Sequence, residues 1–388
     1  MKDYRLDIEG YRELCKEIEV LRKYGHDYRM DKGKWAQYVN RLHPQRLKLR
    51  VSERIQETAS TTTLRLVPVE GYLPPFQAGQ YINLFVEIGG VRTSRPYSIS
   101  SSPTQIAYYD ITVRRIQNGF VSDYLLDKIA VGDILESGSP TGNFHYNPLY
   151  HGNELVFIAG GSGITPFMSM IREAIDRGLQ RKIHLLYGSQ TLEEAIFHHE
   201  LTEKAEHHPS FKYHLILSQP PEGYTGLSGL IDEQMISRLV GDSQDKTFYL
   251  CGPPAMYEFC LPALQSLGVP RKRIRRELYG AVSDIHKAPG WPKEVSTQNQ
   301  VTVDIKGGRA VPQKLKAQTG EPLVVALERN GIQVPTSCRS GECSLCRIKL
   351  LSGKVFEFPG EHVRKSDRDH GYVHACESYP LTDLEILL

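Results

Sequence analysis

Seven cysteines occur in the 388-residue chain, and three of them lie in one short stretch, TSCRSGECSLCRIKL. Cys338, Cys343 and Cys346 are separated by four and then two residues, and Cys376 follows in HACES. Four thiolates spaced C-x4-C-x2-C…C hold the two irons of a [2Fe–2S] cluster. Zinc would usually show two C-x2-C-type pairs, and an odd number of cysteines fits a disulfide framework poorly. We therefore predict a [2Fe–2S] cluster, with Gly341 letting the loop wrap closely around it.

Two further stretches carry Arg, Tyr, Gly and Ser residues that become informative only together, because a Tyr–Ser pair on a strand is by itself usually only sheet packing. RTSRPYSISSSP holds an arginine, whose planar fork suits a phosphate, and a tyrosine, whose ring can pack on a flat heterocycle. NGFVSDYLLD follows, where Gly119 allows a tight turn and Ser122 stands where we expect a helix to start. A helix N-terminus presents N–H groups to a pyrophosphate, although the same residues can also form an ordinary cap.

Two glycine-containing turns follow predicted strands further along the chain. FIAGGSGITPFMSM places glycines between a strand and a helix, where the backbone can approach a pyrophosphate, and proline suits the first helical turn. FYLCGPPAM ends another strand at a cysteine, which in isolation would be an ordinary small core residue. The residues concerned are Gly160, Gly161, Ser162, Gly163, Thr165 and Pro166 in the first turn and Cys251, Gly252 and Pro253 in the second.

Taken in order, these segments resemble the ferredoxin–NADP reductase-like flavoproteins that carry a C-terminal plant-type [2Fe–2S] ferredoxin domain. R-P-Y-S and G-F-V-S match the two flavin motifs of that family, and the two glycine-containing turns match its nicotinamide motifs. EPLVVALERNGIQVPTSC resembles the helix and loop that precede the cluster in plant-type ferredoxins. The resemblance covers about Leu47 to Leu388, and the layout is similar to reductase components of multicomponent oxygenases and to the hybrid-cluster-protein reductase.

The resemblance implies roles for individual residues around a flavin. Arg95 would pair with a flavin phosphate, Tyr97 would pack on the flavin, and Ser98 would hydrogen-bond to N5, the atom that accepts hydride. The complete flavin-binding set that it implies is Arg95, Pro96, Tyr97, Ser98, Gly119, Val121 and Ser122. FAD is favoured, because the second motif matches the branch that binds a pyrophosphate, with FMN as the runner-up.

The resemblance also implies a path for electrons. Cys251 would lie beside the nicotinamide C4 and the flavin N5, and RRELYG would place Glu277 and Tyr279 where the nucleotide domain ends against the flavin. Ser98, Cys251 and Glu277 would then shape the point of hydride transfer. Electrons would pass from a nicotinamide nucleotide to the flavin, to the cluster and on to a partner redox protein, one at a time.

NADH is favoured over NADPH by the residues after the second predicted strand of the nucleotide domain. A 2′-phosphate would need Arg or Lys just after Ser189, whereas YGSQTLEEAIFHHEL supplies Gln190, Glu193 and Glu194. Carboxylates suit a free ribose hydroxyl and repel a phosphate.

Four regions and a linker make up the chain that must position the flavin, nucleotide and cluster motifs. Residues 1–46 predict two short amphipathic helices, with Trp35 in the second, that pack against the next domain. Residues 47–150 hold β-branched and aromatic segments typical of an antiparallel flavin-binding barrel, and residues 151–280 alternate strands and helices as in a parallel doubly wound nucleotide-binding sheet. Residues 281–300 are predicted to be a linker, and residues 301–388 an α+β ferredoxin domain of the β-grasp type.

The composition agrees with a soluble multidomain protein. The formal net charge of +2 gives no argument for nucleic acid, and no apolar run reaches the roughly 20 residues of a membrane span. The N-terminus lacks the apolar core of a signal peptide, so we expect a cytoplasmic location.

Two alternatives to an electron-supplying reductase remain open. One is a self-contained enzyme that reduces a quinone, a free flavin or an oxidised metal, although the ferredoxin unit would then be superfluous. The other is a non-catalytic iron–sulfur module that senses redox state through the N-terminal helices, against which the flavin and nucleotide motifs argue.

Overall fold

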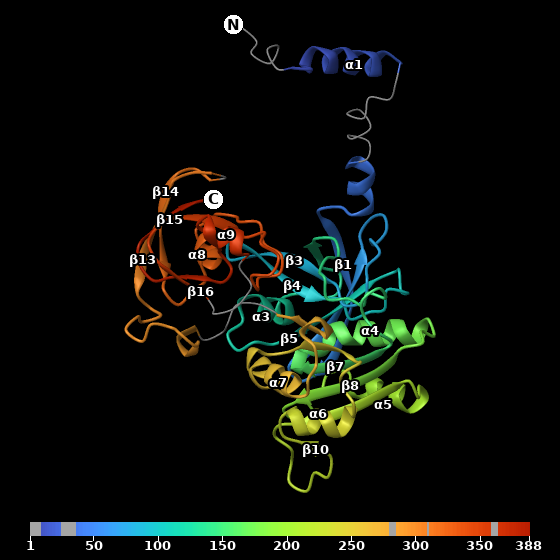
Figure 1. The fold of residues 1–388 in the computed structure, drawn as a ribbon. Helices are drawn as coiled ribbons and strands as arrows, with labels where there is room; N and C mark the ends of the chain where they lie inside the picture. Colours follow the sequence, from blue (N-terminus) through green and yellow to red (C-terminus); the bar gives the residue numbers. More distant parts are fainter. Residues whose placement is uncertain (1–8, 25–35, 279–284, 309, 358–363) are drawn as a thin grey trace. The chain divides into compact units, whose positions relative to one another are not determined.

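The computed structural model describes residues 9–24, 36–278, 285–308, 310–357 and 364–388 (Figure 1). The chain divides between Arg46 and Leu47 into two compact units, which are considered separately. No helix within the described ranges combines the length and the apolar character needed to cross a membrane.

The N-terminal unit contains helix α1, Tyr11–Tyr24, and a second helical segment at residues 36–42. Both expected helices are therefore present, while Trp35, which we expected in the second, lies outside the described residues. Leu14 and Leu21 of α1 are 51% and 50% exposed, whereas Ile18 is half-buried.

The second unit begins with a six-stranded antiparallel sheet in the order β4-β3-β6-β1-β2-β5, confirming the predicted barrel. Its edge strands meet through a bridge between Ile99 and Ile111, which closes the sheet. Alternate residues at the start of β1, including Leu49 and Val51, point into the barrel core, as expected for strands with one solvated face. The elements are β1 Leu47–Thr58, β2 Thr61–Pro68, β3 Tyr81–Ile88, β4 Val91–Ser98, β5 Tyr109–Arg114, α3 Phe120–Asp127 and β6 Ile134–Ser137.

A parallel six-stranded sheet follows in the order β10-β9-β8-β7-β11-β12. Its central strand alternates between two cores, with Phe157 facing one helical layer and Val156 the other. The predicted doubly wound sheet is therefore confirmed. The elements are β7 Glu154–Gly160, η2 Gly161–Gly163, α4 Ile164–Asp176, β8 Lys182–Ser189, α5 His198–His207, β9 Phe211–Leu217, β10 Leu227–Ser228, α6 Glu233–Val240, β11 Thr247–Cys251, α7 Pro254–Ser266, η3 Arg271–Arg273 and β12 Ile274–Glu277.

The C-terminal part forms a mixed five-stranded sheet in the order β14-β13-β19-β15-β17, which confirms the α+β prediction. The segment leading into it, which we expected to be a linker, packs Trp291 against Phe356 and Tyr379 of this part. The elements are η4 Ile285–Lys287, β13 Gln300–Ile305, β14 Gln313–Gln318, α8 Leu323–Arg329, β15 Arg347–Ser352, β16 Val355–Glu357, α9 Lys365–Asp369, β17 Tyr372–His374, β18 Ser378–Pro380 and β19 Leu384–Leu387.

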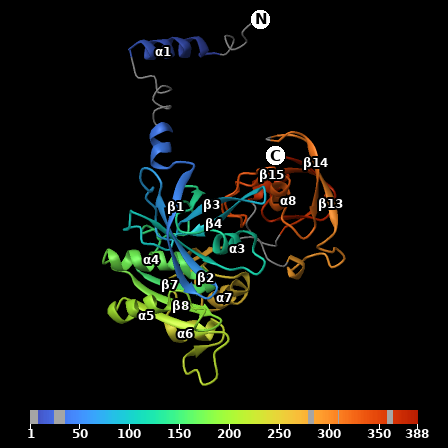
Figure 2. The ribbon, with the colours of Figure 1, turned by 180° about the vertical axis from the view of Figure 1, so that it is seen from behind.

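Both ribbon views show the same neighbours around the barrel within the second unit. Strands β3 and β4 lie beside the ferredoxin-like sheet, while α4 lies between the barrel and the parallel sheet (Figures 1 and 2). The barrel therefore has the ferredoxin-like sheet as one neighbour and the parallel sheet as another, although both follow it in the sequence.

Candidate redox site

The cysteine loop lies between α8 and β15 and is arranged to surround a ligand. Arg339 and Ser344 adopt left-handed backbone conformations with φ of 54° and 57°, which non-glycine residues rarely do, and Gly341 adopts one with φ of 75°. Strain of this kind persists where the surrounding structure imposes it, which is typical of a functional loop.

The four predicted cluster ligands fall into two pairs. The sulfurs of Cys346 and Cys376 lie 3.3 Å apart, and the backbone N–H of Cys343 points at the sulfur of Cys338 over 3.3 Å. A dinuclear cluster takes two thiolates on each iron, so the paired arrangement fits a [2Fe–2S] group. Within the described ranges, no group of three or more His, Cys, Asp or Glu side chains is arranged to hold a metal ion.

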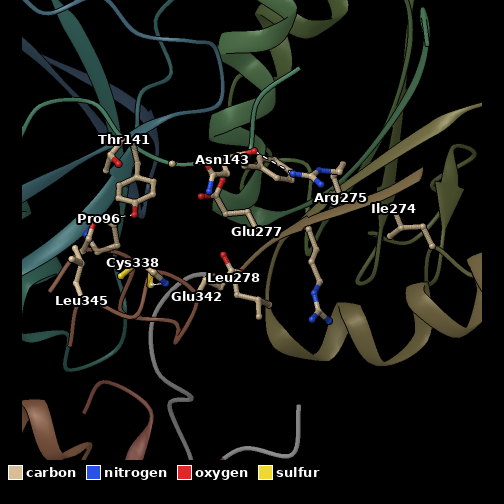
Figure 3. Close-up of a pocket in the computed structure, with 16 residues that line it drawn as sticks. Pro96, Thr141, Asn143, Ile274, Arg275, Glu277, Leu278, Cys338, Glu342 and Leu345 are labelled. Atoms are coloured by element: carbon tan, nitrogen blue, oxygen red, sulfur yellow. Dashed lines mark hydrogen bonds between the residues drawn. The ribbon is translucent and has the colours of Figure 1, made fainter. Parts of the chain in front are cut away.

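A pocket of about 500 Å³ opens beside this loop, where the three parts of the second unit meet (Figure 3). Tyr81 and Pro96 line it from the barrel, Glu277 from the end of β12, and Cys338 and Cys343 from the cysteine loop. The pocket thus joins the R-P-Y-S segment to two of the predicted cluster ligands, which the sequence could only place in separate domains.

The R-P-Y-S segment forms the end of β4, and Ser98, its last residue, pairs with Tyr81 of β3. Burial first, and then the positive charge of Arg339, lower the pKa of Arg95 to about 10. An anion beside these two guanidinium groups would offset both effects, so the surroundings of Arg95 fit a flavin phosphate.

The second flavin segment differs in one detail from our expectation. Helix α3 begins at Phe120 with Gly119 as its N-cap, and Ser122 lies inside the first turn, where its hydroxyl accepts the backbone N–H of Ile116 over 3.2 Å. A Cβ at position 119 would collide with the Ser122 hydroxyl. The lack of a side chain at Gly119 therefore moves the helix start upstream, and the capping role expected of Ser122 is wrong.

The two glycine-containing turns come together at the carboxyl ends of neighbouring strands β7 and β11. A Cβ on Gly163 would collide with the Cys251 carbonyl, and one on Gly160 would lie 2.7 Å from the Pro253 ring. Helix α4 begins at Ile164, as the prediction near Thr165 and Pro166 required. This edge is where doubly wound sheets bind nucleotides, so the cradle fits a dinucleotide.

Cys251 and Glu277 are register partners at the ends of β11 and β12, and both are buried. The structure therefore brings two of the three predicted positioning residues to one place, next to the pocket. Tyr279, which we expected beside them, lies outside the described residues.

Arg114, at the end of β5, was not singled out from the sequence. Its guanidinium lies where a side chain on Gly161 would be, and it forms an ion pair of 3.3 Å with Glu194. Glu194 also accepts a 2.5 Å hydrogen bond from Ser60 of the barrel. Glu194, which we expected at the ribose, therefore connects the nucleotide part to the barrel. The neighbouring Glu193, which we also expected there, is exposed. The first of the two arginines in the barrel segment YYDITVRR is Arg114, and a basic residue at the end of this predicted strand was the available signal.

Three family models match successive parts of the chain. "Oxidoreductase FAD-binding domain" matches residues 46–146, "Oxidoreductase NAD-binding domain" residues 157–261, and "2Fe-2S iron-sulfur cluster binding domain" residues 308–381. Fold and site thus define a flavin- and iron–sulfur-containing NAD(P)H oxidoreductase.

Curated relatives align with most of the chain. The ferredoxin reductase component of 3-ketosteroid-9-alpha-monooxygenase from Rhodococcus rhodochrous is 30% identical over 343 residues, which are 86% of this chain and 94% of the relative. The glycine betaine monooxygenase reductase subunit of Chromohalobacter salexigens is 27% identical over 344 residues, 86% and 92% of the two chains. The solved structure of phthalate dioxygenase reductase shares the fold, with a TM-score of 0.67 and 23% identity over 88% of this chain and 97% of that one.

The chain therefore belongs to the ferredoxin–NADP reductase-like flavoproteins with a C-terminal [2Fe–2S] ferredoxin domain. It is an electron-transfer reductase whose cofactors are FAD, a [2Fe–2S] cluster and NADH.

Proposed function

We propose that this chain is the reductase component of a multicomponent oxygenase, passing electrons from NADH to a separate terminal oxygenase. The proposal is supported above all by the pocket in which Pro96, Glu277 and Cys343 meet, because it places the flavin motif, the nucleotide edge and the cluster loop around one space. Relatives named as monooxygenase reductases support the partner class. We further propose a cytoplasmic location and the domain boundaries 1–46, 47–150, 151–280, 281–300 and 301–388.

The chain's residues are proposed to act by positioning, since the cofactors supply the chemistry. When bound, the flavin accepts a hydride and releases its electrons singly, and the cluster carries one electron at a time. Arg95 and the N-terminus of α3 hold the phosphates of FAD, while the loop Gly160–Gly163 holds those of NADH. Ser98, Cys251 and Glu277 would shape the point of hydride transfer, and the burial of all three would help to keep water away from it.

The thiolates of Cys338, Cys343, Cys346 and Cys376 would hold the cluster. Cys343 is less buried than the other three, and Cys338 and Cys343 both line the pocket that Pro96 of the flavin motif also lines. The backbone N–H groups of Ser340 and Cys343 point at the sulfur of Cys338, which stabilises negative charge there.

The experiment is anaerobic reduction of the purified chain by NADH after iron, sulfide and flavin have been quantified. We expect bound FAD, two irons per chain by the cluster assignment, and an electron paramagnetic resonance signal of the reduced cluster. A chain that binds neither flavin nor iron after reconstitution contradicts the proposal. The oxygenase part is tested by NADH-dependent oxygen uptake by an added terminal oxygenase, which must require this chain.

A self-contained reductase of small acceptors is the alternative that this design separates. In that case quinone reduction would persist when the cluster is removed, and no oxygenase would draw electrons from the chain.

A further inference from the structure

A single hydroxyl lies between the barrel and the cluster loop. Thr93, on β4, is 6% exposed and donates a 2.8 Å hydrogen bond to the carboxylate of Glu328 on α8. The same oxygen accepts hydrogen bonds from Arg95 over 2.7 Å and from Arg339 over 3.0 Å. Arg339 and Glu328 in turn form a buried ion pair.

These three bonds use the full capacity of a threonine hydroxyl, which has one donor and two acceptor positions. Their directions are also settled by chemistry, because guanidinium groups only donate and an ionised carboxylate only accepts. Charged groups buried in this way cost free energy unless each finds its partners. A hydroxyl at position 93 therefore suits its three charged neighbours, and an apolar side chain of the same shape does not.

Two of these neighbours belong to opposite ends of the electron path. Arg95 comes from the predicted flavin-phosphate motif, whereas Arg339 directly follows the cluster ligand Cys338. Beside them, the Thr336 carbonyl accepts a 3.3 Å hydrogen bond from Asn83, and the hydroxyls of Thr336 and Ser94 share one of 3.1 Å.

The stretch around the first cluster ligand is thus held against β3 and β4 from both sides, because Tyr81 of β3 also bonds the Ser337 hydroxyl over 3.0 Å. Each of these bonds joins the barrel to the ferredoxin fold.

Resting on the proposed function, we propose that Thr93 is a positioning residue for flavin-to-cluster electron transfer: its hydroxyl couples the flavin-phosphate arginine to the cluster loop through Glu328 and Arg339. The hydroxyl acts on the separation and ordering of the two cofactors. It has no part in the hydride step.

The test compares Thr93→Val, which keeps the shape and removes the hydroxyl, with Thr93→Ser, which keeps the hydroxyl. Flavin bleaching and the appearance of the reduced cluster are followed separately after anaerobic mixing with NADH. In Thr93→Val we expect the flavin-to-cluster rate to fall about tenfold, the scale of a lost hydrogen bond to a charged group, with a change of less than about threefold in flavin reduction. Thr93→Ser is expected to restore most of the rate.

A matched control comes from inside the barrel. Thr112 is also buried, and its hydroxyl bonds those of Thr63 and Ser100, which both belong to the barrel. Thr112→Val should therefore leave the ratio of the two rates as in the wild type.

The outcomes separate this inference from the proposed function. If the wild-type cluster is never reduced by NADH, the proposed function fails. If the wild type transfers electrons and Thr93→Val does so equally fast, only the role of Thr93 fails. Equal losses in both rates with loss of bound flavin would likewise overturn it, since they would make Thr93 a flavin-retention residue. The circular dichroism of the oxidised cluster is expected to change in Thr93→Val and not in Thr112→Val, a readout that does not depend on turnover.

Discussion

Phe144, which follows β6 of the barrel, packs into the core of the nucleotide sheet, with its ring 5.7 Å from that of Phe167 and 5.4 Å from that of Tyr249. The barrel strands that face the ferredoxin fold offer mainly hydroxyl and amide groups instead, from Tyr81, Asn83 and Ser94. The interface between the barrel and the nucleotide part therefore has an apolar centre around Phe144, with polar contacts such as Ser60–Glu194 and Arg172–Ser100 beside it. The contacts named towards the cluster part are polar.

This difference agrees with what each transfer demands. Hydride transfer needs the reacting atoms in contact, and a continuous apolar core holds its two sides in one arrangement. Single-electron transfer needs proximity only, and polar interfaces between domains allow relative motion. We infer that the nucleotide part is fixed to the barrel, whereas the ferredoxin part is held by replaceable hydrogen bonds.

The largest expected effect comes from removing the cluster. Cys343→Ser should reduce NADH-dependent cytochrome c reduction to near background while ferricyanide reduction by the flavin continues, because only the one-electron route is broken. Cys15→Ser in α1 is the control and should change neither rate. Retained cytochrome c reduction in Cys343→Ser would show that electrons leave directly from the flavin.

The next largest effect is expected at the interface between the barrel and the nucleotide part, from substitution of Arg172. Arg172 of α4 donates to the Ser100 carbonyl of the barrel over 2.8 Å and pairs with Glu200 over 2.5 Å. Because the pair is partly exposed, Arg172→Met should lower the free energy of unfolding by about 1–2 kcal/mol and slow flavin reduction by NADH several-fold. Chemical denaturation and stopped-flow absorbance measure the two effects.

Arg329→Met, which breaks an exposed pair with Glu321 inside the ferredoxin fold, is the matched control. An equal slowing of flavin reduction in this control would show that the effect of Arg172 is not specific to the interface.

A smaller effect is expected from acid. Burial acts to raise the pKa of Glu200, but hydrogen bonds and charge from Arg172 and Lys204 outweigh it and hold the pKa below its ordinary value of 4.5. The stabilisation is therefore complete above about pH 4.5 and is lost as the pH falls through the lowered pKa of the folded state. Over that acidic range Glu200→Gln should show a flatter stability profile than the wild type, by about 1 kcal/mol or less. Parallel profiles would mean that Glu200 keeps its ordinary pKa.

The cluster loop was recognisable in the sequence from the spacing of its cysteines, and the glycine turns from their match to the family's nicotinamide motifs. Four thiolates must reach two irons, and glycine must stand where another chain segment passes, as Gly163 does against Cys251. The strands followed from β-branched runs and the helices from their apolar periodicity, since both patterns are local.

The contacts between parts of the chain could not be predicted in this way. Thr93 and Glu328 are 235 residues apart, and no local pattern records that a strand hydroxyl will meet a helix carboxylate. The capping of α3 was missed for a related reason, because Ser122 turns back towards Ile116 only where Gly119 leaves room. Interfaces and caps depend on which groups remain unpaired after folding, which composition does not show.

The smallest effect on the redox chemistry is expected from deleting residues 1–46. They form a compact unit of their own, and every residue of the redox site lies beyond Leu47. The apolar stripe of α1, including Leu14 and Leu21, is exposed there, which is costly for a helix of 14 residues that serves only as a spacer. Deletion should therefore leave ferricyanide and cytochrome c reduction within about twofold of the full chain, an interval that a surface change rarely exceeds.

Reduction of the terminal oxygenase by the deletion variant tests whether residues 1–46 bind the partner. A selective loss there, reproduced by Leu14→Ser with Leu21→Ser in the full chain, would make the stripe a partner-binding surface. Loss of flavin reduction on deletion would instead show that the first 46 residues support the barrel, and the two units would then have to be treated as one.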